Sequence, residues 1–215
     1  MRTAYEENRR YFRRAYESGV HGWETREPSA YVIRNLGLVA REASGRRLLD
    51  VGCGEGRHCV AAAKMGFRPI GMDYEALAVE RAQAFAREAS VADRIRFVAA
   101  DVYALPFAPA SFDMALDYGC LHHQKKADWP RYCAAIIAAL RPRGWFLLSV
   151  FSAKFRVFGE SRSSWHLAHG AYRRLFTSDD LRQLFDADFE FLALQEERDD
   201  VRGFWHVLMR RKAAR

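Results

Sequence analysis

The 215-residue sequence lacks any apolar run that approaches the roughly 20 residues of a membrane-spanning helix. Residues 1–20 alternate acidic and basic side chains and have no apolar core of the kind that a signal peptide carries. The four cysteines form no Cys-x-x-Cys pair, and no secretory context indicates disulfide bonds. We therefore expect a cytoplasmic protein with reduced cysteines and no segment in a membrane.

The sequence also lacks a metal-binding pattern. Cys120, His122 and His123 lie close together, but no second pair of ligands stands at the spacing of a zinc site. We interpret Cys120 as a reduced, buried cysteine at the end of a strand, and we predict no metal site.

Lysine is scarce, with only five positions, so arginine carries nearly all of the positive charge behind the net charge of +7. A basic balance can favour nucleic acid or acidic partners. The arginines are scattered, however, and no basic block with regularly interleaved aromatic residues is present. We interpret the charge as solvated surface and do not predict nucleic acid as a partner.

What the sequence does contain is one stretch, residues 46–66, around which the rest is organised. A short apolar run at 48–51 is typical of a buried parallel strand. Glycines then occupy alternate positions, 52, 54 and 56, and an alanine-rich helical segment follows, with Gly66 as its C-cap. Strand, glycine turn and helix N-terminus together predict a ligand site, because glycines let the backbone approach a ligand closely.

The order of the elements predicts an α/β fold. Beyond residue 46, strand and helix patterns alternate, which is typical of a parallel sheet with helices on both faces. Strands are expected at 47–51, 68–73, 95–100, 112–117, 144–151, 189–196 and 204–211, and the link before the last strand suits an antiparallel hairpin. Helices are expected at 3–17, 29–43, 56–65, 75–89 and 129–140 and after Thr177.

The spacing of the glycines narrows the choice of ligand. A dinucleotide fingerprint requires Gly-x-Gly-x-x-Gly, but Arg57 occupies the position of its third glycine. The observed pattern, Asp50-x-Gly52-x-Gly54-x-Gly56, resembles motif I of the class I S-adenosylmethionine-dependent methyltransferases. The resemblance implies a Rossmann-like sheet of seven mostly parallel strands, the last one antiparallel, with an N-terminal helical cap. It also implies S-adenosylmethionine as the cofactor and S-adenosylhomocysteine as its product.

We expect a single domain in four segments. Residues 1–45 form the helical cap and residues 46–150 the cofactor-binding core. Residues 151–176 form a long irregular insertion after a central strand, where open α/β sheets bind ligands, and whether it closes as a lid stays open. Residues 177–215 form a C-terminal helix and a β-hairpin.

The resemblance assigns cofactor contacts to the ends of the second and third strands. Asp73, followed by Tyr74, ends the second strand, where a carboxylate can accept both ribose hydroxyl hydrogens. Asp101 ends the third strand and is expected to accept from the adenine amine, while the backbone N–H of Val102 reaches the ring.

Further contacts are assigned to the glycine turn. Asp50 is expected to orient the turn by accepting from its amides rather than to contact the cofactor closely. The backbone of Gly52, Cys53 and Gly54 is expected to approach the methionyl and ribose parts. Arg57 either reaches the cofactor carboxylate or pairs with a surface acid such as Glu55.

The segment after the fourth strand is expected to lie beside the transferring methyl group. Asp117 and Tyr118 begin it, and Gly119-Cys120 follows where adenine and amide N-methyltransferases carry a proline motif, which counts against a nucleobase amine as acceptor. His122 and His123 are candidates for a general base, because histidine titrates in the range that this role needs. The alternative role is packing against the cofactor.

The acceptor pocket is predicted to involve Tyr16 and Trp23 of the cap and His166 of the insertion, where His166 and His169 are rival bases. We predict a small-molecule acceptor. In its overall size and in the continuation Gly56-Arg57-His58, the sequence is similar to the bacterial tellurite-resistance and thiopurine methyltransferases. An RNA methyltransferase and a non-catalytic S-adenosylmethionine-binding module are the alternatives. The acceptor atom, whether oxygen, nitrogen, sulfur or a metalloid, stays open.

Overall fold

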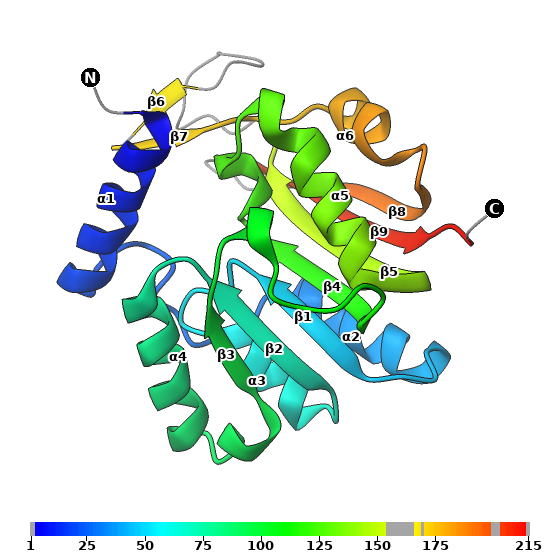
Figure 1. Cartoon of the computed structure of the whole chain (residues 1–215), viewed down its shortest axis with the longest axis horizontal. Helices are drawn as coiled ribbons and strands as arrows, with labels where there is room; N and C mark the ends of the chain where they lie inside the picture. Colours follow the sequence, from blue (N-terminus) through cyan, green and yellow to red (C-terminus); the bar gives the residue numbers. More distant parts are fainter. Residues whose placement is uncertain (1–2, 154–165, 169, 199–202, 214–215) are drawn as a thin grey trace.

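The computed structural model describes residues 3–153, 166–168, 170–198 and 203–213. Its centre is a seven-stranded sheet in the order β3-β2-β1-β4-β5-β9-β8 (Figure 1). The strands are β1 Arg47–Val51, β2 Arg68–Asp73, β3 Arg96–Ala99, β4 Phe112–Tyr118, β5 Leu140–Phe151, β8 Phe189–Arg198 and β9 Gly203–Arg211. The pairs among β1 to β5 are parallel, and β9 is antiparallel to both β5 and β8. The predicted sheet, including its reversed last strand, is confirmed.

Helices cover both faces of this sheet. Helices α2 (Ala30–Glu42) and α3 (Arg57–Lys64) pack on one face, and α5 (Trp129–Ala139) and α6 (Ser178–Phe185) pack on the other. Adjacent residues of β1 show the division: Leu48 joins the core under α2, and Leu49 joins the core under α5. This follows from the pleat, because successive side chains of a strand point to opposite faces. Helix α4 (Ala76–Glu88) packs against α3 and β3.

The N-terminal cap begins with α1 (Ala4–Ser18), which lies at the edge of the molecule beside β7 and α4 (Figure 1). A capping box between Thr3 and Glu6 starts the helix, and Gly19, at φ +71°, ends it in the left-handed region that glycine favours. The predicted helix at 3–17 is therefore present, shifted by one residue.

Two expected features differ from the structure. The insertion contains a small hairpin, β6 (His166–Ala168) and β7 (Ala171–Arg173), where the sequence predicted irregular chain; residues 154–165 and 169 lie outside the described residues. Strand β5 begins at Leu140, directly after α5, rather than at residue 144. The pairing of β5 with β4 shifts register there, which accommodates Pro142 at a place where a regular ladder would need its missing N–H.

None of the helices in the described part of the chain is both long and apolar enough to cross a membrane.

Candidate functional site

The glycine turn after β1 has the backbone that its sequence predicts. Gly52, Gly54 and Gly56 have φ of +69°, +54° and +81°, which side chains rarely adopt. Space is restricted as well: a Cβ on Gly52 would lie 2.9 Å from the Cβ of Cys120, and one on Gly54 would lie 3.2 Å from the Tyr16 hydroxyl. A cradle that only bare backbone can line fits the close approach that S-adenosylmethionine requires.

Gly56 offers a direct test of this geometry. A Cβ there would lie 2.9 Å from both the Cβ of Ala82 and the ring of Phe97, whereas a Cβ on Gly66, at a similar φ of +84°, meets nothing within 4 Å. Gly66→Ala should therefore lower the free energy of unfolding by only the backbone cost of about 1–2 kcal/mol. Gly56→Ala should add overpacking and lower it by about 3 kcal/mol or more. Urea unfolding measures both; equal losses would contradict the steric argument.

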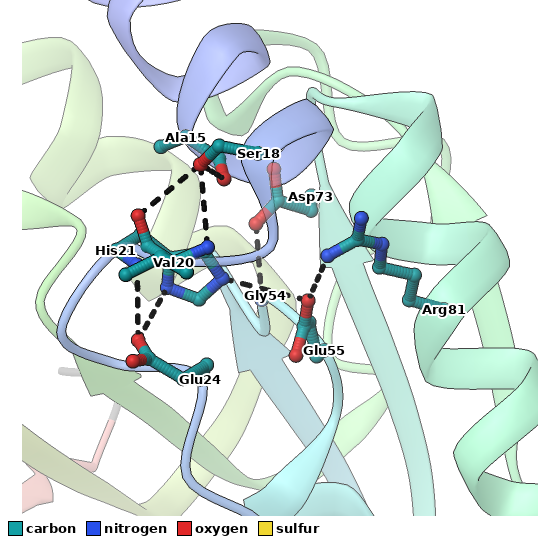
Figure 2. Close-up of polar contacts among 9 residues, drawn as sticks. All are labelled: Ala15, Ser18, Val20, His21, Glu24, Gly54, Glu55, Asp73 and Arg81. Carbon is teal, nitrogen blue, oxygen red and sulfur yellow. Dashed lines mark hydrogen bonds and ion pairs between the residues drawn. The ribbon is translucent and has the colours of Figure 1, made fainter.

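Asp73 ties the glycine turn to β2. Its Oδ2 accepts from the backbone N–H of Gly54 at 3.0 Å (Figure 2). Its Oδ1 accepts from the backbone N–H of Glu75, also at 3.0 Å. The side chain is buried, and burial raises the pKa of the Asp73 carboxyl to about 6. An ionised carboxylate has further lone pairs, so it can still accept from ligand hydroxyls.

The prediction for Asp50 is wrong. It was expected to accept from amides of the glycine turn, but its carboxylate accepts from the thiol of Cys59 at 3.3 Å, and the Gly54 amide of that turn donates to Asp73. The Cys53 amide donates to the carbonyl of Met72. Asp50 is fully enclosed under the first turn of α3, and burial raises the pKa of its carboxyl to about 7.

Asp101 lies at the end of β3, next to β2, so the sheet brings it to the same edge as Asp73. Its Oδ1 accepts from the N–H of Tyr103, and its Oδ2 pairs with Arg9 of the cap at 3.0 Å. The Arg9 guanidinium also lies over the ring of Tyr74, 5.2 Å from the centroid. The cap therefore covers Asp101 and Tyr74, two of the predicted cofactor contacts, through a link that no local sequence pattern indicates.

Arg57 and Glu55 do not pair with each other among the recorded ion pairs. Glu55 pairs with Arg81 of α4 at 2.9 Å and faces His21 at 3.5 Å (Figure 2). The Arg57 guanidinium instead lies over the ring of Tyr118 at 5.3 Å. The pairing of Arg57 with Glu55 is therefore not found in this geometry, and its contact with the cofactor carboxylate stays a prediction.

Asp117 organises the segment after β4. Its side chain has no exposed surface, and it accepts from the backbone N–H groups of Gly119, Cys120 and Leu121 at 2.7–2.9 Å. It also accepts from the hydroxyl of Tyr132 on α5. The carboxylate thus folds the loop around itself, and its hydrogen-bond partners are three loop amides and one helix hydroxyl.

His122 and His123, both in the short turn η3 (Leu121–His123), have opposite surroundings. Nδ1 of His122 accepts from the N–H of Phe151, and its ring stacks on Phe151 at 3.7 Å. Nδ1 of His123 lies 2.9 Å from the carbonyl oxygen of Tyr172, and its ring meets Phe12 of the cap edge-on at 4.8 Å. Burial lowers the pKa of both imidazoles, that of His123 to about 3.

The linker after α1 closes over the glycine turn. The side chain of His21 is fully buried, with Nδ1 3.3 Å from Glu24 and Nε2 3.5 Å from Glu55 (Figure 2). Trp23 lies against the His21 ring at 4.3 Å and against Tyr16 at 6.2 Å. Two of the three residues predicted to line the acceptor pocket therefore lie together beside the glycine turn.

The third, His166, is placed by its backbone alone, which pairs with Arg173 across the β6–β7 hairpin. Its side chain and the whole of His169 lie outside the described residues. A cavity of about 480 Å³ opens between α1 and Gly170, lined by Arg10, Tyr11 and Arg14 among others. Groups of three or more metal-ligating side chains are not found in the described ranges.

Fold and site together define the class of protein. The glycine turn follows β1, Asp73 ends β2 and Asp101 follows β3, all at one edge of the sheet. The strand order is that of the class I S-adenosylmethionine-dependent methyltransferases. Residues 48–144 match the family model described as a methyltransferase domain. Residues 48–144 thus resemble a methyltransferase domain, and the fold is that of the class I S-adenosylmethionine-dependent methyltransferases.

Individual relatives agree with this assignment. The chain is similar to the 1,6-didemethyltoxoflavin-N1-methyltransferase of Burkholderia thailandensis, solved with 1,6-didemethyltoxoflavin and S-adenosylhomocysteine bound, with a TM-score of 0.80 and 27% identity, covering 99% of this chain and 92% of that one. It is 36% identical to the 27-O-demethylrifamycin SV methyltransferase of Amycolatopsis mediterranei over 55% of this chain and 43% of that protein. It is 29% identical to the ubiquinone biosynthesis O-methyltransferase of Brucella ovis over 55% and 46%. The matched segments span less than half the length of these two curated relatives.

Proposed function

We propose that this chain transfers the methyl group of S-adenosylmethionine to a small molecule whose acceptor atom carries a proton. The observation that supports the cofactor most directly is the glycine turn anchored to Asp73, with Asp101 at the adjacent strand end. The relatives named above act, by their names, on small molecules, which supports the acceptor class.

Each predicted cofactor contact keeps a proposed role except Asp50. Asp73 accepts from the ribose hydroxyls, Tyr74 and the Asp101–Val102 pair hold the adenine, and the bare backbone of residues 52–54 lies along the methionyl chain. Arg57, beside Tyr118, pairs with the cofactor carboxylate. Asp117 acts through the loop that it folds rather than by touching the cofactor.

The bound cofactor would supply an electrophilic methyl group on a sulfonium whose departure as a neutral thioether needs no acid. The protein's task is then to align the acceptor, exclude water and take a proton. The cap, through Tyr16 and Trp23, excludes water above the glycine turn. Burial lowers the pKa of His123, so its imidazole is neutral and keeps a lone pair, although the same shift weakens it as a base. Its proposed role is to accept the proton of the acceptor. His122 packs against Phe151 and supports the loop.

The narrower likeness to tellurite-resistance and thiopurine methyltransferases stays a prediction. It relied on Gly56-Arg57-His58, and each of these residues has a local structural role. Gly56 leaves room for Phe97, and Arg57 covers Tyr118. His58 is buried, and its Nε2 accepts from the N–H of Ser29 at 3.3 Å. These local contacts do not distinguish that subgroup from other methyltransferases.

Calorimetric titration with S-adenosylhomocysteine tests the cofactor, and transfer of labelled methyl from S-adenosylmethionine to a panel of phenols, thiols and heteroaromatic N–H compounds tests the reaction. Absence of binding heat together with an unchanged melting temperature would overturn the proposal. Binding without transfer to any acceptor would favour a non-catalytic module. Salt-sensitive binding of tRNA would favour the RNA alternative.

Cofactor affinity should depend on pH through Asp73. The ionised carboxylate is the form that accepts from ribose hydroxyls, and with a pKa of about 6 it is lost as the pH falls. The dissociation constant of S-adenosylmethionine should therefore rise about tenfold from pH 7 to pH 5 and change little above pH 7. Asp73→Asn should bind more weakly and lose this dependence. An equal dependence in Asp73→Asn would assign it to another group, such as Asp50.

A further inference from the structure

Asn8 of the cap helix makes contacts that its sequence context does not predict. It is 4% exposed, its Oδ1 accepts from the N–H of Tyr172 at 2.6 Å, and its Nδ2 donates to the Tyr172 carbonyl at 3.1 Å. The amide side chain thus binds both polar groups of one residue of β7, as a neighbouring strand would. The same carbonyl oxygen faces Nδ1 of His123 at 2.9 Å. A carbonyl has two lone pairs, so it can accept from both side chains at once.

This carbonyl determines the tautomer of His123. Because a carbonyl can only accept, the hydrogen lies on Nδ1 and the lone pair on Nε2. His122 has the reverse arrangement, since its Nδ1 accepts from Phe151 and its hydrogen therefore lies on Nε2. Of the two adjacent imidazoles, His123 is the one whose lone pair lies on Nε2.

We propose that Asn8 is a positioning residue for His123: by holding the Tyr172 peptide, the cap helix fixes the Nδ1–H tautomer and so presents Nε2 to the acceptor. The inference extends the proposed function. A new bond forms between the acceptor atom and the methyl carbon, the bond from that carbon to sulfur breaks, and the acceptor proton passes to Nε2 and then to water. The base is therefore complete only when the cap is docked.

The hairpin has a second attachment that makes this testable. The N–H of Arg174 donates to the carbonyl of His122 at 2.8 Å, so β7 stays bound to η3 when Asn8 is changed. Asn8→Leu should then release the Tyr172 peptide from the cap without removing the hairpin. Asn35, 6% exposed in α2 and bonded through Nδ2 to the carbonyl of Tyr31, is a matched buried asparagine away from this site.

The experiment records two-bond ¹H–¹⁵N correlations of the histidine rings in the full chain, with and without S-adenosylhomocysteine. The wild type should show His123 as a single Nδ1–H tautomer and His122 as Nε2–H. Asn8→Leu should give a tautomer mixture at His123 alone, and Asn35→Leu should give none. Should Asn8→Leu fail to fold, Asn8→Asp, which keeps the acceptor and loses the donor, should still shift His123.

An Nε2–H tautomer at His123 in the wild type, or an unchanged tautomer in both Asn8 variants, would overturn the inference. So would an equal shift in Asn35→Leu, which would indicate a general loosening. Calorimetry on the same samples keeps the two proposals apart, because a wild type that fails to bind S-adenosylhomocysteine contradicts the proposed function while the tautomer result still stands.

Discussion

Replacing Asp73 by alanine should weaken the binding of S-adenosylmethionine by on the order of 1–3 kcal/mol, which is about 5- to 150-fold in the dissociation constant. Two losses add up. The ribose hydroxyls lose their acceptor, and the backbone N–H groups of Gly54 and Glu75 lose the carboxylate that holds the glycine turn in place. The second loss affects the whole cradle, so the methionyl part should be bound less well too.

Calorimetric titration measures the effect, and Asp93→Ala is the control, because the Asp93 side chain is 78% exposed and lies away from the turn. Circular dichroism should show both variants folded. An Asp73→Ala variant that binds within twofold of the wild type would remove Asp73 from the cofactor site.

Replacing Asp117 by alanine should have the largest effect on stability. The change leaves three backbone N–H groups and the Tyr132 hydroxyl without their acceptor in a fully buried place. Since each unsatisfied buried donor costs about 1–3 kcal/mol, with partial relief where the loop can reach water, we expect a loss on the order of 3–5 kcal/mol.

Tyr132→Phe is the matched control. It removes one of the four donors together with its need for a partner, so it should lower the free energy of unfolding by only about 1 kcal/mol. Urea unfolding measures both variants. If Asp117→Ala were as mild as Tyr132→Phe, the carboxylate would not be what folds the segment that carries His122 and His123.

The core of the fold could be predicted because its signals are local. Alternating apolar strands, the spacing of Gly52, Gly54 and Gly56, and acids at strand ends each indicate a structure within a few residues. In a parallel sheet these ends meet at one edge, so Asp73 and Asp101 could be brought together from the order of the strands.

The cap and the insertion could not be predicted in the same way. Asn8 contacts Tyr172, and Glu55 contacts His21, across long separations in sequence that no periodicity encodes. Asp50 shows a different limit. The sequence placed it correctly on β1. Its hydrogen-bond donor, however, depended on the direction of its side chain under α3, and there the Cys59 thiol is the donor in place of a turn amide.

The enclosed carboxylates of Asp50, Asp73 and Asp117 lie on the three neighbouring strands β1, β2 and β4, and repulsion from Asp117 and Asp73 helps to raise the pKa of Asp50. A cation placed beside them would drive protons off, whereas an uncharged molecule would not. Under the proposed reaction, the sulfonium enters as a cation and leaves as a neutral thioether. The same negative field that draws in the substrate would then loosen its hold as soon as the methyl group has gone, so turnover would promote exchange of the spent cofactor.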